Sequence, residues 1–452
     1  MLDKDSLSLL RQALEQLDAG FQSLPEGASP PPDFDRVSQI LREAAERLQD
    51  NYPYFHPLYA GQMLKPPHPV ARLAYALTQW INPNNHALDG GRASSAMEKE
   101  AVAEIARMFG WREFLGHLTS GGTVANLEAL WIAGQLCPGK TILASEQAHY
   151  THHRICGVLQ LKFEAIPCDD RARIDLGVLK KRAERGDIGT VVATMGTTAT
   201  GSVDCLPEIL KLSERYGFRV HCDAAYGGYF VLSGNLADDT RAAFDQISRA
   251  DSIVIDPHKH GLQPFGCGCV LFRDPGVGRF YKHDSPYTYF SSKELHLGEI
   301  SLECSRPGAA AVALWATQRL LPLVSGGEFA CGLEASRGAA LDLYERIGKD
   351  GRFWCAMPPE LDIVVLVPRA RRIGEASALS RKIFEAAARR NLHLAVADLP
   401  TRFFGGDLAG DGSGTEERAT VTCLRSVLMK PEHREWVEQI WKLLSEATDE
   451  SV

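Results

Sequence analysis

From about residue 93 onward, short apolar runs alternate with amphipathic segments along the chain. The apolar runs contain many β-branched residues and predict strands at 141–144, 163–167, 190–194, 219–222, 252–255 and 268–272. Helical spacing of apolar residues predicts helices at 96–109, 123–136, 176–185 and 206–217, between several of these strands. The alternation predicts an α/β fold in which helices cover both faces of a mainly parallel sheet.

Both ends of the chain depart from this alternation. Helical periodicity at 5–18 and 36–49, interrupted by a proline-rich linker at 25–32, predicts that residues 1–60 form an N-terminal helical arm. Residues 61–325 would form the large domain. After Ser325-Gly326-Gly327, residues 326–452 would form a smaller C-terminal α+β domain with a long helix, a strand at 361–367, a helix near 375–390, a glycine-rich loop at 405–414 and a strand at 420–428.

Composition narrows the class of protein. The 452 residues are 45% hydrophobic and 23% charged, which is enough for a large core. The formal net charge of −8, with no long basic block, makes a nucleic-acid partner unexpected. The N-terminus lacks the features of a signal peptide, and no run of eighteen apolar residues occurs, so we expect no membrane span and a cytoplasmic location.

The eleven cysteines are scattered without paired spacing, so we expect reduced thiols in an intracellular enzyme. Cys267-Gly268-Cys269 has no accompanying pair of ligands at metal-site spacing. We therefore interpret this tripeptide as strand packing and expect no metal site.

Two predicted strands end in residues suited to an aldehyde cofactor. Strand 252–255 is followed by Asp256-Pro257-His258-Lys259, which places Lys259 beyond the strand's C-terminal end, where open α/β sheets bind ligands. A lysine there can form a Schiff base, although a surface lysine in a turn is the alternative. Strand 219–222 is followed by Asp223, and a carboxylate about 4 Å from a pyridine nitrogen favours its protonated form by about 4 kcal/mol at an effective dielectric near 20. The pair predicts pyridoxal phosphate.

A glycine-rich segment supplies a candidate phosphate site. Ser120-Gly121-Gly122-Thr123 precedes the helix predicted from Thr123. Glycines let the backbone approach an anion, and the helix N-terminus and threonine hydroxyl offer donors. The segment lacks the Gly-Lys-Ser/Thr of a nucleoside triphosphate loop.

In this order along the chain, the motifs resemble those of the group II pyridoxal-phosphate-dependent amino acid decarboxylases. This fold-type I family includes the aromatic amino acid, glutamate and archaeal tyrosine decarboxylases, and the resemblance spans about residues 54–441. It implies a fold-type I transferase-like fold, pyridoxal 5'-phosphate as cofactor, and decarboxylation of an L-amino acid to its amine. It also implies a homodimer in which the N-terminal arm packs across the partner.

The resemblance assigns further residues. Gly122 and Thr123 would hold the cofactor phosphate, His149 would lie on the cofactor's face, and the other cofactor contacts would be Thr198, Ala225 and His258. Ordinary loop histidines and simple turn chemistry are the alternatives. His152 and His153 match no family position, and we expect them to be such loop histidines.

Substrate contacts are expected from Arg425 and His56. Arg425 matches the family arginine that binds the substrate's α-carboxylate, a role that suits the guanidinium fork, although an arginine ending a strand is most often solvent-facing. His56 lies in the aromatic segment 52–57, which resembles the family's approach to the active site; an ordinary loop histidine is the equal alternative.

The polar, aromatic segment 280–297 predicts a mobile loop that closes over a ligand. In the family, such a loop carries a tyrosine that protonates the substrate carbanion. We assign this role to Tyr289, with Tyr287 as the second choice.

Two features leave alternatives open. Ser305-Arg306-Pro307-Gly308 resembles sphingosine phosphate lyases and some archaeal-type decarboxylases more than the animal aromatic enzymes. A carbon–carbon lyase or an aminotransferase on the same fold is the alternative activity. Asp256 would repel a phosphate, so we expect its side chain to point away, to serve as an N-cap or to accept a hydrogen bond from His258.

The substrate's side chain is not predicted. An acidic side chain would need a cation, for which the candidates are Arg92, His56 and His86, and an aromatic one would need a slot, for which the candidates are Phe55, Tyr59 and Trp80.

Overall fold

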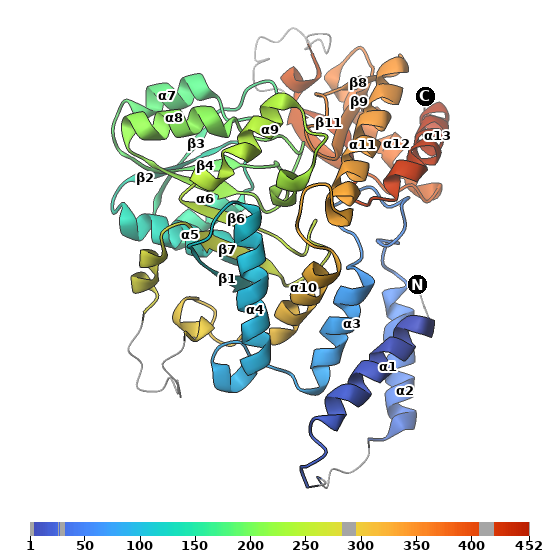
Figure 1. Ribbon diagram of the computed structural model, residues 1–452. Helices are drawn as coiled ribbons and strands as arrows, with labels where there is room; N and C mark the ends of the chain where they lie inside the picture. Colours follow the sequence, from blue (N-terminus) through green and yellow to red (C-terminus); the bar gives the residue numbers. More distant parts are fainter. Residues whose placement is uncertain (1–3, 26, 28–31, 283–294, 406–419, 452) are drawn as a thin grey trace.

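The computed structural model describes residues 4–25, 27, 32–282, 295–405 and 420–451 (Figure 1). Its larger sheet has seven strands in the order β1-β7-β6-β5-β4-β2-β3. They are β1 (Leu115–Thr119), β2 (Thr141–Ser145), β3 (Lys162–Ile166), β4 (Ile188–Thr194), β5 (Arg219–Asp223), β6 (Ser252–Ile255) and β7 (Gly268–Phe272). β7 runs antiparallel to β1 and β6, and all other neighbours are parallel. The predicted mainly parallel sheet is confirmed.

Helices cover this sheet on both faces. They are α4 (Leu88–Met108), α5 (Gly122–Leu136), α6 (Thr151–Val158), α7 (Leu176–Ala183), α8 (Leu206–Tyr216), α9 (Asp238–Asp245) and α10 (Gly308–Leu320). Ile253 and Ile255 of β6 pack into the core formed with α4, α8 and α10, whereas Val254 packs against α5 on the opposite face. Because both faces are buried, the strand is continuously apolar instead of alternating.

The second domain contains a four-stranded antiparallel sheet in the order β10-β11-β9-β8. Its strands are β8 (Phe353–Cys355), β9 (Ile363–Pro368), β10 (Ala395–Pro400) and β11 (Thr420–Val427), and its helices are α11 (Glu328–Lys349), α12 (Ile373–Arg389) and α13 (His433–Ser451). The α+β character predicted for the C-terminal part is confirmed. The boundaries 1–60, 61–325 and 326–452 stay predictions.

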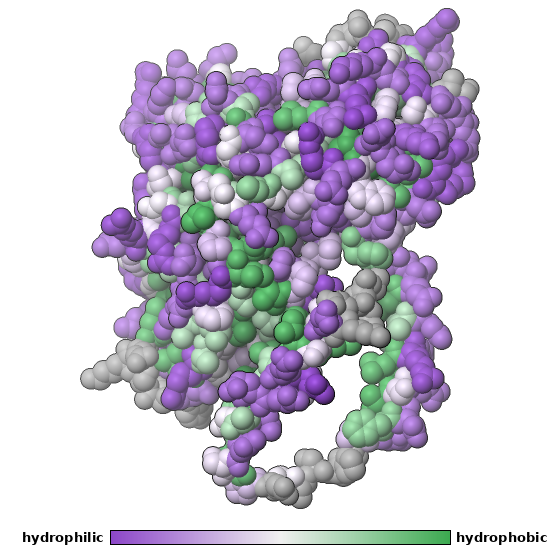
Figure 2. All heavy atoms as spheres, turned by 45° about the vertical axis from the view of Figure 1, so that its right-hand side comes forward, coloured by the Kyte–Doolittle hydropathy of each residue, from purple (hydrophilic) through white to green (hydrophobic). Residues whose placement is uncertain are grey.

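The N-terminal helices α1 (Lys4–Ala19) and α2 (Phe34–Leu48) form a hairpin that projects from the body (Figure 1). α1 contacts α3 (Pro69–Leu77), whereas no residue of α2 is buried. Figure 2 shows apolar side chains in green along this arm. The hairpin therefore leaves an apolar face without a partner among the described residues.

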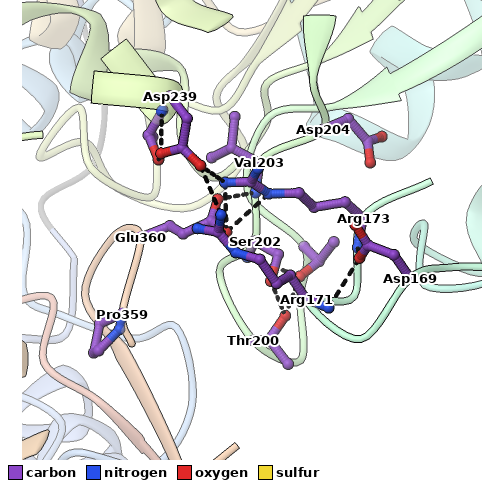
Figure 3. A network of polar contacts seen from close by, with 12 residues as sticks. Asp169, Arg171, Arg173, Thr200, Ser202, Val203, Asp204, Asp239, Pro359 and Glu360 are labelled. Carbon is purple, nitrogen blue, oxygen red and sulfur yellow. Dashed lines mark hydrogen bonds and ion pairs between the residues drawn. The ribbon is translucent and has the colours of Figure 1, made fainter. Parts of the chain in front are cut away.

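A buried ion pair joins the two domains (Figure 3). Arg173, in a loop of the large domain, lies 2.8 Å from Glu360, which lies three residues before the start of β9 in the second domain. Glu360 also accepts a hydrogen bond of 2.8 Å from the backbone N–H of Val203. Burial raises the pKa of Glu360, and Arg173 opposes that rise. The pair fixes the loop that runs from Gly196 to Val203 against the second domain.

Candidate active site

A cavity of about 290 Å³ lies at the C-terminal ends of β4, β5 and β6. This volume is near the lower end of the range of about 300 to 1,000 Å³ for small-molecule sites. Eight of the residues predicted to bind the cofactor or to act in catalysis line it: Gly122, Thr123, His149, Thr198, Asp223, Ala225, His258 and Lys259. The fold thus gathers at one place residues that lie up to 137 positions apart in the sequence.

The floor of the cavity at α5 can accept an anion. The helix begins at Gly122, and no side chain caps its first N–H groups. A Cβ on Gly268 would lie 2.5 Å from the backbone carbon of Gly121, which itself has φ of +155°. Only glycines fit this close approach, and the exposed N–H groups and helix dipole suit a phosphate.

Asp223 presents an ionised carboxylate to the same cavity. Its Oδ1 accepts a hydrogen bond of 3.1 Å from the N–H of Ala225, and its Oδ2 lies 2.9 Å from Nε2 of His152. Burial by itself raises the pKa of Asp223, but the contact with His152 and the nearby His221 and Lys259 outweigh it and hold the pKa well below its usual range. A fixed, buried anion of this kind fits a pyridinium nitrogen.

Lys259 contacts Asp256 across one turn. Its Nζ lies 2.9 Å from Oδ2 of Asp256, and its N–H donates to the backbone oxygen of Asp256. The expectation that Asp256 points away from the phosphate site is wrong, because Asp256 lines the cavity and a Cβ on Gly122 would lie 2.6 Å from its carboxylate. The alternative expectation, that Asp256 accepts a hydrogen bond from His258, is also wrong. Nε2 of His258 lies 3.6 Å from Oδ2 of Asp256, which is too long for a hydrogen bond.

His258 is held instead by Cys267, the residue before β7. Its Nδ1 lies 2.7 Å from the backbone oxygen of Cys267, and its N–H donates to the same oxygen. Cys267 and Cys269 are buried, as the interpretation of this tripeptide as strand packing requires.

His149 precedes α6 and carries a neutral ring. Its Nδ1 accepts a hydrogen bond of 3.3 Å from the N–H of Thr151. Burial lowers the pKa of His149, Lys259 lowers it further, and the opposing effect of Asp223 does not restore it. The ring is therefore uncharged near neutral pH, a state that suits stacking on a heteroaromatic ring.

Arg425 reaches toward the cavity from the second domain but does not line it. It lies within β11, and its Nε donates to the backbone oxygen of Ala199 at 3.0 Å, next to Thr198. Its Nη1 lies 3.4 Å from the backbone oxygen of Gly61 and 3.4 Å from Oε1 of Gln62. Its buried Nη2 has no hydrogen-bond partner among the described residues. A buried guanidinium with a donor to spare is suited to a carboxylate ligand.

His56 lies elsewhere. Its ring packs edge-on against Trp436, with centroids 4.9 Å apart, and its Nδ1 accepts the N–H of Leu58. The cavity lining contains neither His56 nor any of the other candidate side-chain anchors Phe55, Tyr59, Trp80, His86 and Arg92. Tyr287 and Tyr289 lie outside the described residues.

One contact at this site was not expected from the sequence. The expectation that His152 is an ordinary loop histidine is wrong, because it lies buried in the first turn of α6 and contacts Asp223. Its partner is 71 residues away in the chain, so no local pattern reveals the contact.

The fold and the cavity define a class: an α/β enzyme with a lysine, a carboxylate and a helix N-terminus converging at the strand ends. The pyridoxal-dependent decarboxylase conserved domain matches residues 28–367, and the chain belongs to this family. The predictions of the decarboxylase family and of pyridoxal phosphate as cofactor are confirmed.

Similar proteins include an L-tyrosine decarboxylase of Enterococcus faecium, 29% identical, with 67% of this chain and 66% of that protein covered. An L-aspartate decarboxylase of Thermococcus kodakarensis is 28% identical, with 62% and 71% covered. This chain thus spans about two thirds of the length of the enterococcal relative. The Oryza sativa TDC structure with PLP and tryptamine superposes with a TM-score of 0.78 at 20% identity, over 99% of both chains, and shows the shared fold.

The glycine floor gives a testable prediction. Gly268→Ala places a Cβ against the backbone of Gly121, so we expect a loss of roughly 1–3 kcal/mol in the free energy of unfolding and weaker binding of pyridoxal phosphate. Gly157→Ala is the control, because its Cβ meets nothing within 4 Å on α6, and it should gain up to about 1 kcal/mol. Urea denaturation and cofactor titration measure both effects. Equal behaviour of the two variants would contradict the proposed close approach.

Proposed function

We propose that this chain releases the α-carboxylate of an L-amino acid as carbon dioxide and yields the amine, using the cavity at the ends of β4, β5 and β6. The observation that carries the proposal is the convergence of Lys259, Asp223 and the uncapped N-terminus of α5 on one cavity. Pyridoxal phosphate, when bound, supplies an electron sink for the pair left by the broken carbon–carboxylate bond.

Each lining residue has a role in this proposal. Lys259 binds the cofactor covalently through Nζ, and Gly122 and Thr123 hold its phosphate with N–H groups and a hydroxyl. Asp223 keeps the pyridine nitrogen protonated because its own carboxylate stays ionised. His149 offers its neutral ring for stacking; Thr198, Ala225 and His258 complete the contacts.

Arg425 is proposed to bind the substrate's α-carboxylate. Its unpartnered Nη2 and its contact with Ala199, next to the cavity-lining Thr198, support this role. The relatives act on tyrosine and on aspartate, which share only the α-amino acid group. The proposal therefore specifies an L-amino acid and leaves its side chain to the assay. His56 does not line the cavity among the described residues, so a role in substrate binding would require His56 to act from outside this lining, for example across a dimer.

We further propose a homodimer in the cytoplasm. On α2, Phe34, Leu41 and Leu48 are 70%, 64% and 66% exposed, and their spacing puts them on one face of the helix. Such a face is favourable only when covered, and a second copy is the partner that the family resemblance implies. All eleven cysteines are free, which supports a reducing compartment. None of the helices in the described part of the chain is both long and apolar enough to cross a bilayer.

The reaction is tested with a panel of L-amino acids, assayed for carbon dioxide release by protein loaded with pyridoxal phosphate. We expect release from at least one member and none from Lys259→Ala, because the covalent link is lost. Borohydride reduction should attach the cofactor to Lys259. Lys282→Ala, a change at an exposed lysine, should leave both results unchanged. Attachment at another lysine would overturn the assignment.

The charge of Asp223 gives a second test. Asp223→Asn keeps the size of the side chain but removes the anion, so we expect kcat to fall about 10²–10³-fold. Asp170→Asn is the control, since the side chain of Asp170 is 82% exposed. Steady-state kinetics measure the change, and an unimpaired Asp223→Asn enzyme would make Asp223 a structural residue.

The homodimer is tested on α2. Leu41→Glu combined with Leu48→Glu places charges on the apolar face and should convert a dimer to a monomer in sedimentation equilibrium. Glu43→Gln, an exposed position on the same helix, should remain dimeric. A wild-type monomer, or a dimer that both glutamates leave intact, would refute this part of the proposal.

A further inference from the structure

The carboxylate of Asp223 has a side-chain partner on a neighbouring helix. Nε2 of His152, on α6, lies 2.9 Å from Oδ2 of Asp223, while Oδ1 accepts the backbone N–H of Ala225 at 3.1 Å. The side chains of His152 and Asp223 are 1% and 6% exposed. With both oxygens held, the plane of the carboxylate is fixed.

The position of His152 is unusual for its helix. α6 buries Thr151, His152, Ile155 and Cys156, and the last two pack into an apolar core under the sheet. An imidazole taken out of water costs free energy unless its nitrogens are bonded. Nδ1 of His152 has no hydrogen-bond partner among the described residues, so Asp223 is the contact that offsets this cost. An apolar side chain would serve packing alone better.

No other imidazole in the described structure takes this role. His221 is also buried beside Asp223, but its Nε2 lies 2.9 Å from Asn126 and its Nδ1 lies 2.8 Å from Ser252, so both nitrogens are already bonded. Nδ1 of His149 accepts the N–H of Thr151. His152 is therefore the histidine that is hydrogen-bonded to Asp223.

We propose that His152 is a positioning residue of the cofactor site, which donates Nε2–H to Oδ2 of Asp223 and thereby orients this carboxylate toward the pyridine nitrogen of pyridoxal phosphate. The proposal rests on the proposed function, in which Asp223 is the partner of that nitrogen. A donor to one oxygen stabilises the anionic carboxylate and leaves its remaining lone pairs for the cofactor. The lowered pKa of Asp223 agrees with this arrangement, since the contact with His152 is the foremost influence opposing burial.

The test compares donors at position 152. His152→Leu and His152→Phe fill the space without a donor, whereas His152→Gln carries an amide N–H that can replace Nε2–H. His153→Leu is the matched control, because His153 is exposed on the same turn of the helix and packs near Phe163 instead. The readouts are the dissociation constant of pyridoxal phosphate for the apoprotein and the pH dependence of the bound cofactor's absorbance spectrum.

We expect His152→Leu and His152→Phe to weaken cofactor binding about ten- to hundredfold and to shift the spectrum, as loss of a hydrogen bond to a charged group does. His152→Gln should restore most of both, and His153→Leu should match the wild type. In an Asp223→Asn background, His152→Leu should have a much smaller effect, because the group it positions is gone.

The outcomes separate this proposal from the proposed function. If Asp223→Asn binds the cofactor with unchanged affinity and spectrum, the assignment of Asp223 fails and the role of His152 falls with it. If Asp223→Asn is impaired but His152→Leu and His152→Phe behave like His153→Leu, only the role of His152 is overturned. Should the apolar variants fail to fold, His152→Gln is compared with His152→Asn, whose shorter amide cannot reach Asp223. If these two variants change cofactor affinity and spectrum equally, the role of His152 is overturned as well.

Discussion

A buried negative charge is the most demanding feature of this structure. An ionised carboxylate in a protein interior costs several kcal/mol unless hydrogen bonds or opposite charges compensate it. Asp223 meets this condition with a backbone N–H, the imidazole of His152 and the proximity of Lys259. These partners come from three places in the sequence, and parallel pairing of β5 with β6, which sets Asp223 opposite Val254, brings two of them to one edge of the sheet. The fold thus places these partners so that the carboxylate of Asp223 stays ionised although it is buried.

The second domain completes the site without lining the cavity. Glu360 holds Val203 and Arg425 holds Ala199, so the loop between β4 and α8 is hydrogen-bonded at two points to groups of the smaller domain. Thr198, which lines the cavity, directly precedes Ala199 in this loop. A change in the packing of the two domains would therefore move a cavity wall; the contact in Figure 3 that holds them includes the buried pair of Arg173 with Glu360 and the partly exposed Arg171, 3.1 Å from Glu360.

Sequence reasoning placed the central strands within two residues because each is a continuous apolar run buried on both faces. It did not predict β8, which has three residues, or β10, whose Asp398 and Pro400 argue against a strand. It also did not predict helix α6, because the two histidines and the glycine of this segment give no amphipathic pattern. Residues at strand ends were predictable because parallel strands bring them together. A role for Arg425 was expected from the family resemblance, but its position outside the cavity lining depends on domain packing. The contact of His152 with Asp223 depends on helix packing, which no local pattern shows.

The described cavity lining supplies groups for the cofactor but few for the substrate's side chain. Among the described residues that line it, Lys259 is the single lysine or arginine, and it is proposed to hold the cofactor; Tyr226 is the single aromatic side chain besides His149 and His258. An acidic side chain needs a cation to bind, and an aromatic one needs an apolar surface. The described lining offers no lysine or arginine besides Lys259, and its apolar side chains, Val124, Ala225 and the buried Tyr226, are few. An acidic side chain would therefore need a cation beyond this lining, and such a group can differ among relatives without disturbing Asp223 and Lys259.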